Sequence, residues 1–225
     1  MDDKEFYLDA IRDIVPENET DSLQNTFYSF LELEHLYDSA IELVKTQLNI
    51  DNEFSMRFQR NPIHNIESRI KSPQSIIGKL QRKGFAVSPE SARIHLQDIA
   101  GVRVICYYVD DIYAIANLLT EHSAFQLKRI KDYIKNPKLN GYRSFHMILN
   151  VPVYMANGKE FAPVEIQIRT IAMDFWASLE HQLHYKSIGN QDVAASLTDE
   201  LKQCAETIAE TDLKMQDMFK EISRL

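Results

Sequence analysis

The stretch between residues 131 and 146 gathers side chains suited to hold a phosphorylated ligand. Asn140 and Gly141 form a strong turn signal within it, because both residue types tolerate positive φ angles. Cations, one tyrosine and one histidine surround this turn, namely Lys131, Lys135, Lys138, Tyr142, Arg143 and His146. Cations bind phosphate groups, and an aromatic ring stacks on a base. The stretch therefore indicates a site for a ligand that carries both, although a solvated basic hairpin has the same composition.

A second group of cations precedes this stretch. Alternation predicts a strand over 64–72, and Ser72-Pro73 predicts the start of a helix over 74–83 that stops at Gly84. No glycine-rich loop precedes that helix, so side chains would have to bind the phosphates of a nucleotide. A solvated helix face is the alternative. The cations that these two elements place together are Arg69, Lys71, Lys79 and Arg82.

One carboxylate lies where a metal ion could bind. Asp98 comes just before an apolar run that predicts a buried strand over 102–108, in which Arg103 lies opposite the valines. Mg²⁺ prefers one or two carboxylates together with phosphate oxygens, so a carboxylate at a strand end suits it. A turn or capping role for Asp98 is the alternative. A later strand over 161–169 alternates cleanly, and its polar face consists of Glu165, Gln167 and Arg169. This face either meets solvent, as on any half-exposed sheet, or lines a site.

The elements that must position these residues predict an α/β (α+β) protein. We expect a mixed, mostly antiparallel sheet of about five strands flanked by helices. Asn157-Gly158 predicts the hairpin between the last two strands. The predicted strands span 64–72, 102–108, 125–134, 144–155 and 161–169, and the predicted helices span 4–15, 22–48, 74–83, 89–96, 110–122, 170–186 and 193–222.

The last predicted helix carries a heptad seam. Its apolar positions are spaced four and three residues apart, as in helices that pack along one stripe. Such a seam either packs back on the body or joins another subunit, and we expect a homo-oligomer, a tetramer in preference to a dimer. The seam consists of Leu197, Leu201, Cys204, Ile208, Thr211, Met215, Met218 and Ile222.

Charge and composition limit the class of protein. The chain of 225 residues has a net charge of −8, but residues 57–143 hold 15 Lys and Arg against 7 Asp and Glu, a net of +8, so the remainder carries −16. A basic middle in an acidic protein indicates a localised anion site. No apolar run reaches the roughly 18 residues of a membrane span, and the N-terminus lacks the pattern of a secretory signal. With only Cys106 and Cys204, we expect a protein of a reducing cytoplasm.

Four segments together resemble the synthetase domain of the RelA/SpoT family over roughly residues 56–187. In order, they are Arg69-Ile-Lys-Ser with Lys79 and Arg82, Asp98-Ile-Ala-Gly-Val-Arg103, Lys138-Leu-Asn-Gly-Tyr-Arg-Ser-Phe-His146 and Val164-Glu-Ile-Gln-Ile-Arg-Thr170. The short chain resembles a stand-alone small alarmone synthetase, of the RelP branch more than of the RelQ branch. The resemblance divides the chain into N-terminal helices (1–55), a synthetase domain (56–187) and a C-terminal oligomerisation helix (188–225).

The resemblance implies a nucleotidyltransferase-like fold and a GTP pyrophosphokinase. The enzyme would transfer the β,γ-pyrophosphate of ATP to the ribose 3′-OH of GDP or GTP, giving AMP and ppGpp or pppGpp. Hydrolase domains of longer relatives carry a His-Asp motif, and no His-Asp dipeptide occurs in this chain. We therefore expect synthesis without hydrolysis. The sequence decides neither between GDP and GTP nor how the enzyme is regulated.

The resemblance also implies the roles of individual residues. Arg69 and Arg103 would sandwich adenine, a role that suits planar guanidinium groups. Asp98 would ligate Mg²⁺, with Glu165 as a second ligand, as the general base for the 3′-OH, or as both. The cations expected at the ATP phosphates are Lys71, Lys79 and Arg82. The residues expected at GDP or GTP are Lys131, Lys138, Tyr142 as the ring that stacks on guanine, His146, Gln167, and Asp174 at the guanine edge.

Three other readings of the sequence remain open. Another nucleotidyltransferase would use a similar sheet to transfer AMP and would release pyrophosphate. An RNA-binding module would use the basic centre, with Tyr142 as a stacking platform, and its binding would depend steeply on salt. RNA binding is compatible with catalysis but is not indicated by any residue pattern. A catalytically inactive relative is the third reading, although every motif position that we compared is filled.

Overall fold

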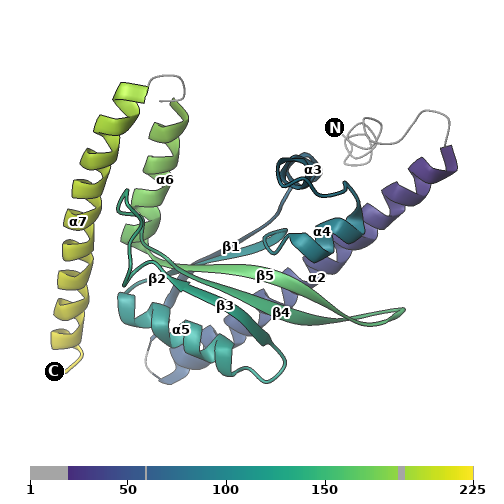
Figure 1. Ribbon diagram of the computed structural model, residues 1–225. Coiled ribbons are helices and arrows are strands. Elements are labelled where there is room, and N and C mark those ends of the chain that lie inside the picture. Colours follow the sequence, from purple (N-terminus) through teal and green to yellow (C-terminus); the bar gives the residue numbers. More distant parts are fainter. Residues whose placement is uncertain (1–19, 59, 187–190, 225) are drawn as a thin grey trace.

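The computed structural model describes residues 20–58, 60–186 and 191–224, which form a mixed sheet flanked by helices (Figure 1). The helix predicted over 4–15 lies outside these residues. The strands are β1 (Ile63–Ile70), β2 (Ala100–Cys106), β3 (Gln126–Asp132), β4 (Phe145–Met155) and β5 (Gly158–Thr170). The helices are α2 (Thr20–Phe58), α3 (Pro73–Arg82), α4 (Pro89–His95), α5 (Val109–Glu121), α6 (Ile171–Lys186) and α7 (Gln191–Ile222).

The five strands are ordered β1-β2-β5-β4-β3. Among them only β2 and β5 pair in parallel, and the other neighbours are antiparallel. The predicted fold class is therefore confirmed, and each predicted strand and helix on described residues has a counterpart. The helix predicted over 22–48 is too short, because α2 continues for ten more residues to Phe58, and the strand predicted over 161–169 begins three residues after the start of β5. The bounds predicted for β2 are wrong by two residues at each end. The strand stops at Cys106 because the amide of Tyr107 bonds to the carbonyl of Pro62 and the amide of Tyr108 bonds to Asp111 at the start of α5.

One face of the sheet is closed by α2 and α5, which lie beneath it in Figure 1. Alternate residues of the central strands point into this core, as the period of a strand requires. Val102 and Val104 of β2 and Ile166 of β5 are fully buried there. Helix α2 contributes Tyr37, Val44 and other residues to the same core.

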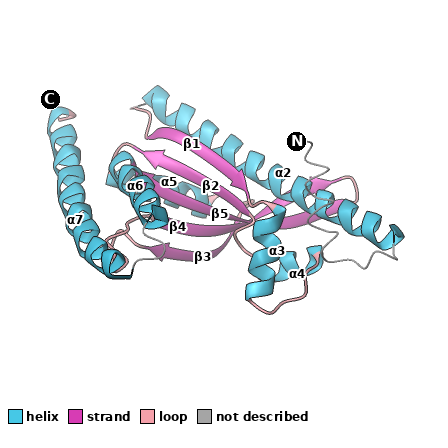
Figure 2. Cartoon of the chain, turned by 90° about the horizontal axis from the view of Figure 1, so that it is seen from above, coloured by secondary structure: helices cyan, strands magenta, loops and turns pink. Residues whose placement is uncertain are grey.

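The other face is left open between two pairs of helices. Helices α3 and α4 stand over one end of the sheet, and α6 and α7 stand over the other end, as the view from above also shows (Figures 1 and 2). Local signals in the sequence set the start of the first pair, because the Ser72 and Ser88 side chains accept from backbone amides and a proline follows each. Gly84 then ends α3 with a φ of +71°.

Helix α7 packs back on the body through part of the predicted seam only. Leu201 and Ile208 pack against a small buried cluster with α6, whereas Met215, Met218 and Ile222 are more than half exposed. The side chains buried against the body, Ala205, Asp212 and Gln216, are ones that the heptad pattern omits. Asp212 and Gln216 are polar and carry no apolar signal, and Ala205 lies next to the seam position Cys204, off the four-and-three spacing. The pattern therefore missed this face.

Candidate active site

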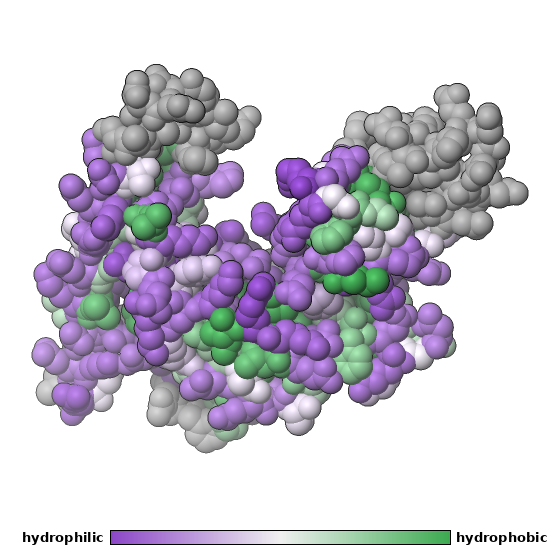
Figure 3. Space-filling view, in the orientation of Figure 1, coloured by the Kyte–Doolittle hydropathy of each residue, from purple (hydrophilic) through white to green (hydrophobic). Residues whose placement is uncertain are grey.

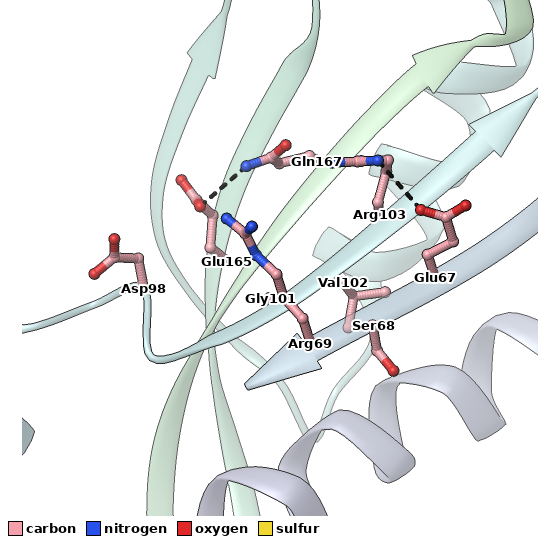
Figure 4. A pocket seen from close by; sticks show the side chains of 9 residues that line it. All are labelled: Glu67, Ser68, Arg69, Asp98, Gly101, Val102, Arg103, Glu165 and Gln167. Atoms are coloured by element: carbon pink, nitrogen blue, oxygen red, sulfur yellow. Dashed lines mark hydrogen bonds and ion pairs between the residues drawn. The ribbon is translucent and has the colours of Figure 1, made fainter. Parts of the chain in front are cut away.

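The register of the sheet brings the predicted polar residues onto its open face. Across the five strands, one row of paired residues runs Glu67, Arg103, Gln167, His146 and Lys131. The next row pairs Arg69 with Gly101 and Gly101 with Glu165. An open cleft lies over these rows, with about 520 Å³ of free space when the solvent at its mouth is included. Its lining includes Arg69, Asp98, Arg103, Glu165 and Gln167 (Figure 4). Figure 3 shows the surface hollowed at this place, with mostly hydrophilic residues around it.

Asp98 lies on the loop before β2 and receives two ammonium groups on one oxygen. Its Oδ2 atom is 2.6 Å from Nζ of Lys71 and 2.5 Å from Nζ of Lys79. Burial disfavours the charged carboxylate, but the two lysines outweigh burial and lower the pKa of Asp98 below its ordinary value. The predicted meeting of Lys71 and Lys79 is therefore present.

Arg82 does not join that group. It is exposed on α3, and its guanidinium lies beside Gly78. The predicted spacing of three residues does place Arg82 on the helix one turn from Lys79, but the convergence of all four cations predicted from the sequence is not seen. Arg69 is exposed and lies across Gly101, with its guanidinium directed towards Glu165 (Figure 4).

Glu165 is held by its neighbours on the sheet. Its Oε1 atom is 3.6 Å from Nδ1 of His146, and its Oε2 atom accepts a hydrogen bond of 3.2 Å from Gln167. The contact with His146 lowers the pKa of Glu165, burial opposes that shift, and the bond from Gln167 adds to it. The charge of Asp98 acts in the raising direction, so the two carboxylates are close enough to influence each other. Glu165 is accordingly an ionised group at neutral pH.

The acceptor-side residues surround Tyr142. Its hydroxyl lies 2.8 Å from Nε2 of His146. The ammonium of Lys138 lies 4.5 Å from the centre of the Tyr142 ring, within the range of a cation–π contact. Lys131 is exposed, pairs with His146 in the sheet register and lies 6.0 Å from the Tyr133 ring.

Arg169 connects these groups, and the sequence analysis gave it no role. It is buried, and its Nη2 donates to the Tyr142 hydroxyl at 2.6 Å and to Oε1 of Gln167 at 3.0 Å. Its Nη1 donates to Asp174 at 3.1 Å. The alternation of β5 placed Arg169 on the polar face with Glu165, and its presence there was the available signal.

Asp174 lies between the two predicted pockets. Besides Arg169, its Oδ1 atom lies 3.6 Å from the guanidinium of Arg103, which also donates to Glu67 at 3.2 Å. Glu67 lines the cleft, and the sequence analysis gave it no role. A glutamate on the polar face of a short strand is the usual pattern of a residue that faces solvent, so its position gave no signal of a site.

The residues present fit a bound Mg²⁺. Oδ1 of Asp98 is buried and, within the part of the chain that the structure describes, has no hydrogen-bond partner. A buried carboxylate oxygen without a partner is costly unless a cation or a donor completes it. Glu165 supplies a second carboxylate across the same cleft. Two oxygen donors suit Mg²⁺ that shares its remaining positions with phosphate and water.

This fold and cleft define a nucleotide-dependent transferase: paired carboxylates face converging cations, and an aromatic ring lies beside them. Residues 68–190 match the region found in RelA/SpoT proteins, and the chain belongs to this family. It is 46% identical to GTP pyrophosphokinase YwaC of Bacillus subtilis (strain 168) over 188 residues, covering 83% of this chain and 89% of YwaC.

A further relative and a solved structure agree with this assignment. Identity to GTP pyrophosphokinase YjbM of the same organism is 34%, covering 83% of this chain and 86% of YjbM. The higher identity to YwaC, a synthetase of the RelP type, confirms the predicted branch. The structure of small alarmone synthetase 1 from B. subtilis bound to its product pppGpp matches with a TM-score of 0.74 at 33% identity, covering 83% of this chain and 94% of that chain.

Proposed function

We propose that the protein is a GTP pyrophosphokinase that transfers the β,γ-pyrophosphate of ATP to the 3′-OH of GDP or GTP. The products are AMP and ppGpp or pppGpp. The observation that carries the proposal is the pair of carboxylates, Asp98 and Glu165, in one cleft with two lysines on Asp98. The names of YwaC and YjbM and the pppGpp complex of a related synthetase support the same reaction.

On the ATP side, positively charged side chains bind the nucleotide. Arg69 and Arg103 line the cleft from neighbouring strands, where planar guanidinium groups flank the adenine. Lys71 and Lys79, which share Asp98 as counter-ion, bind the phosphates when ATP enters. Cations fixed near a polyphosphate stabilise the charge that develops during transfer. Arg82, exposed one turn further along α3, meets the outer part of the triphosphate.

The acceptor side orients the 3′-OH. Tyr142 stacks on guanine, Lys131, Lys138 and His146 face the phosphates or ribose, and Asp174 accepts from the guanine edge. Glu165 takes the proton of the 3′-OH, for which its ionised form is required. Gln167 holds the carboxylate in place through its bond of 3.2 Å.

Asp98 and Glu165 would hold Mg²⁺. The ion, when bound, neutralises phosphate charge and orients the transferred group. The other roles belong to protein side chains. Lys71 and Lys79 bind the phosphates, and Glu165 accepts the proton of the 3′-OH.

The exposed end of the α7 seam supports a homo-oligomer, with a tetramer favoured over a dimer. The seam residues that remain exposed there are Met215, Met218 and Ile222, and Leu213, outside the seam, is also exposed. We also propose the division into helices (1–55), synthetase domain (56–187) and C-terminal oligomerisation helix (188–225). None of the described helices has the length and apolar character needed to span a bilayer, and neither cysteine forms a disulfide. A cytoplasmic location is in keeping with the free cysteines.

Separation of nucleotides by chromatography tests the reaction. The protein is incubated with ATP, GDP and Mg²⁺, and AMP and ppGpp are expected in equal amounts. Release of pyrophosphate without AMP would instead favour transfer of AMP by another nucleotidyltransferase. Absence of turnover would favour a binding module.

A further inference from the structure

The loop that carries Tyr142 rests directly on helix α7. Gly141, the residue before the ring, has a φ of +88°, which residues with a side chain rarely adopt. A Cβ atom at Gly141 would lie 2.5 Å from Cβ of Ala205 and 3.2 Å from Cα of Lys202. The loop backbone thus touches α7 at the turn that immediately precedes the ring.

Side chains on both sides of the contact hold the loop there. Arg143 donates through Nη1 to the carbonyl of Gly141 at 3.1 Å and to the carbonyl of Ala205 at 3.2 Å. The indole N–H of Trp176 in α6 donates to the carbonyl of Leu201 in α7 at 3.0 Å. Trp176, Ala177 and Ala205 form a small buried cluster apart from the main core, and Tyr142 packs against this cluster.

The position of α7 does not depend on the loop, because its other turns are anchored elsewhere. Thr170, at the end of β5, donates to Asp212 at 2.6 Å. The amide of Asp110 at the start of α5 donates to Gln216 at 2.8 Å, and the Phe219 ring stacks on Tyr108 at 4.6 Å. The helix is therefore a fixed surface against which the loop is set.

Tyr142 consequently has two supports. Arg169 and His146 bond to its hydroxyl over the sheet, and the cluster with α6 and α7 supports its ring, with the Trp176 ring 6.4 Å away.

Since backbone and helix already touch, a larger side chain on α7 must move either the loop or the helix. The loop is also tied to α6, where Asn140 donates to Glu180 at 3.3 Å. Gly141 nevertheless lies in a turn outside regular secondary structure, whereas α7 is a continuous helix bonded at Asp212 and Gln216. We therefore assign the movement to the loop.

We propose that α7 positions the acceptor-nucleotide pocket and that Ala205 is the positioning residue through which it acts. The inference rests on the proposed function, in which Tyr142 stacks on guanine. Ala205 meets no nucleotide in this scheme. Its contact fixes the position of the Gly141 backbone, and the position of Gly141 in turn fixes that of the Tyr142 ring.

Ala205→Val tests the proposal by adding two methyl groups at the contact. Trp176 is the single tryptophan of the chain, so its fluorescence reports on the cluster during a titration with GDP. We expect the dissociation constant for GDP to rise by about tenfold, since a displaced stacking ring loses part of its contact. The KM for ATP should stay that of the wild type, and kcat at saturating GDP should change little.

Cys204→Val is the matched control, because it enlarges the neighbouring residue of the same helix, whose side chain is exposed. It should bind GDP like the wild type. Light scattering on all variants checks that the mass of the assembly is unchanged. Equal weakening of ATP and GDP in Ala205→Val, or unchanged GDP binding, would overturn the proposal.

A second pair of variants decides the question even where Ala205→Val fails to fold. Gly141→Ala should weaken GDP binding, and Ala205→Gly in the same chain should recover part of the loss by removing the opposing Cβ atom. No recovery would count against the contact. A wild type that binds GDP but makes no AMP would refute the proposed reaction alone, because the fluorescence titrations still determine the role of Ala205.

Discussion

The ATP side and the acceptor side of the cleft hold their polar groups in different ways. On the ATP side, Arg69 is exposed, and Lys71 and Lys79 share one carboxylate, Asp98. On the acceptor side, the polar groups bond to one another around Tyr142 and the buried Arg169. On the first side, the lysine ammonium groups can leave the carboxylate and bind another anion. On the second side, the hydrogen bonds already fix the shape of the pocket.

We infer from this difference that the two halves have different tasks. A triphosphate is highly charged, so in the proposed reaction Lys71 and Lys79 would pass from Asp98 to phosphate and would keep a counter-ion throughout. Recognition of a guanine nucleotide requires donors, acceptors and a ring in fixed positions. Side chains that are already held by hydrogen bonds to one another lose little further conformational entropy when the nucleotide binds. The variants below test this division, beginning with the largest expected effect.

Asp98→Asn should reduce AMP release by at least about 100-fold, the order found when a group that stabilises the transition state is removed. The amide cannot serve as an anionic metal ligand, and Lys71 and Lys79 lose their shared counter-ion. Glu160→Gln is the control, because Glu160 pairs with Arg93 at 2.6 Å outside the cleft, and it should retain full turnover. Undiminished turnover in Asp98→Asn would remove Asp98 from the reaction.

Glu165→Gln should lower kcat by about 10²- to 10⁴-fold with little change in either KM, as expected for loss of a general base. The wild type should lose activity at acidic pH as Glu165 and Asp98 become protonated, and the pKa of each lies below its ordinary value, 4.5 and 3.8 respectively. His146→Asn removes the main cause of the lowering at Glu165, so the acidic limb of the kcat profile should move to higher pH. A limb that stays in place, with folding checked by circular dichroism at each pH, would separate Glu165 from proton transfer.

The sequence predicted groups that act through their chemical type and missed those that act through their surroundings. Asp98, Glu165 and Tyr142 were found because a carboxylate at a strand end, strand alternation and a ring in a basic turn are visible in the sequence. Their roles came from the family resemblance. The sheet order and the row from Glu67 to Lys131 follow from pairing between distant segments, which no local pattern specifies.

Arg169 and Ala205 show why the other residues of the candidate site could not be predicted from the sequence. Arginine on a strand face usually meets solvent, and only the fold buries Arg169 against Tyr142 and Asp174. Ala205 carries no polar or reactive group, and it is not one of the positions in the heptad seam. Its importance comes from the approach of Gly141, more than sixty residues earlier in the chain.

Arg69→Ala and Tyr142→Ala should affect opposite nucleotides, each by about tenfold in KM, because loss of a stacked partner costs on the order of 1–3 kcal/mol. Arg69→Ala should raise the KM for ATP, and Tyr142→Ala should raise the KM for GDP. Initial rates measured with one nucleotide varied and the other saturating separate the two. An effect of Tyr142→Ala confined to ATP would show that the two pockets are interchanged.

Tyr142→Phe should have the smallest effect, a rise of about fivefold in the KM for GDP, because a lost hydrogen bond costs on the order of 1 kcal/mol. The ring remains, but His146 and Arg169 both lose the hydroxyl that joins them. Tyr154→Phe, at an exposed position in β4, is the control and should leave the KM unchanged. A preformed acceptor side requires that this hydroxyl matter although it contacts no phosphate, and a KM equal to that of the wild type would show that the ring alone defines the pocket.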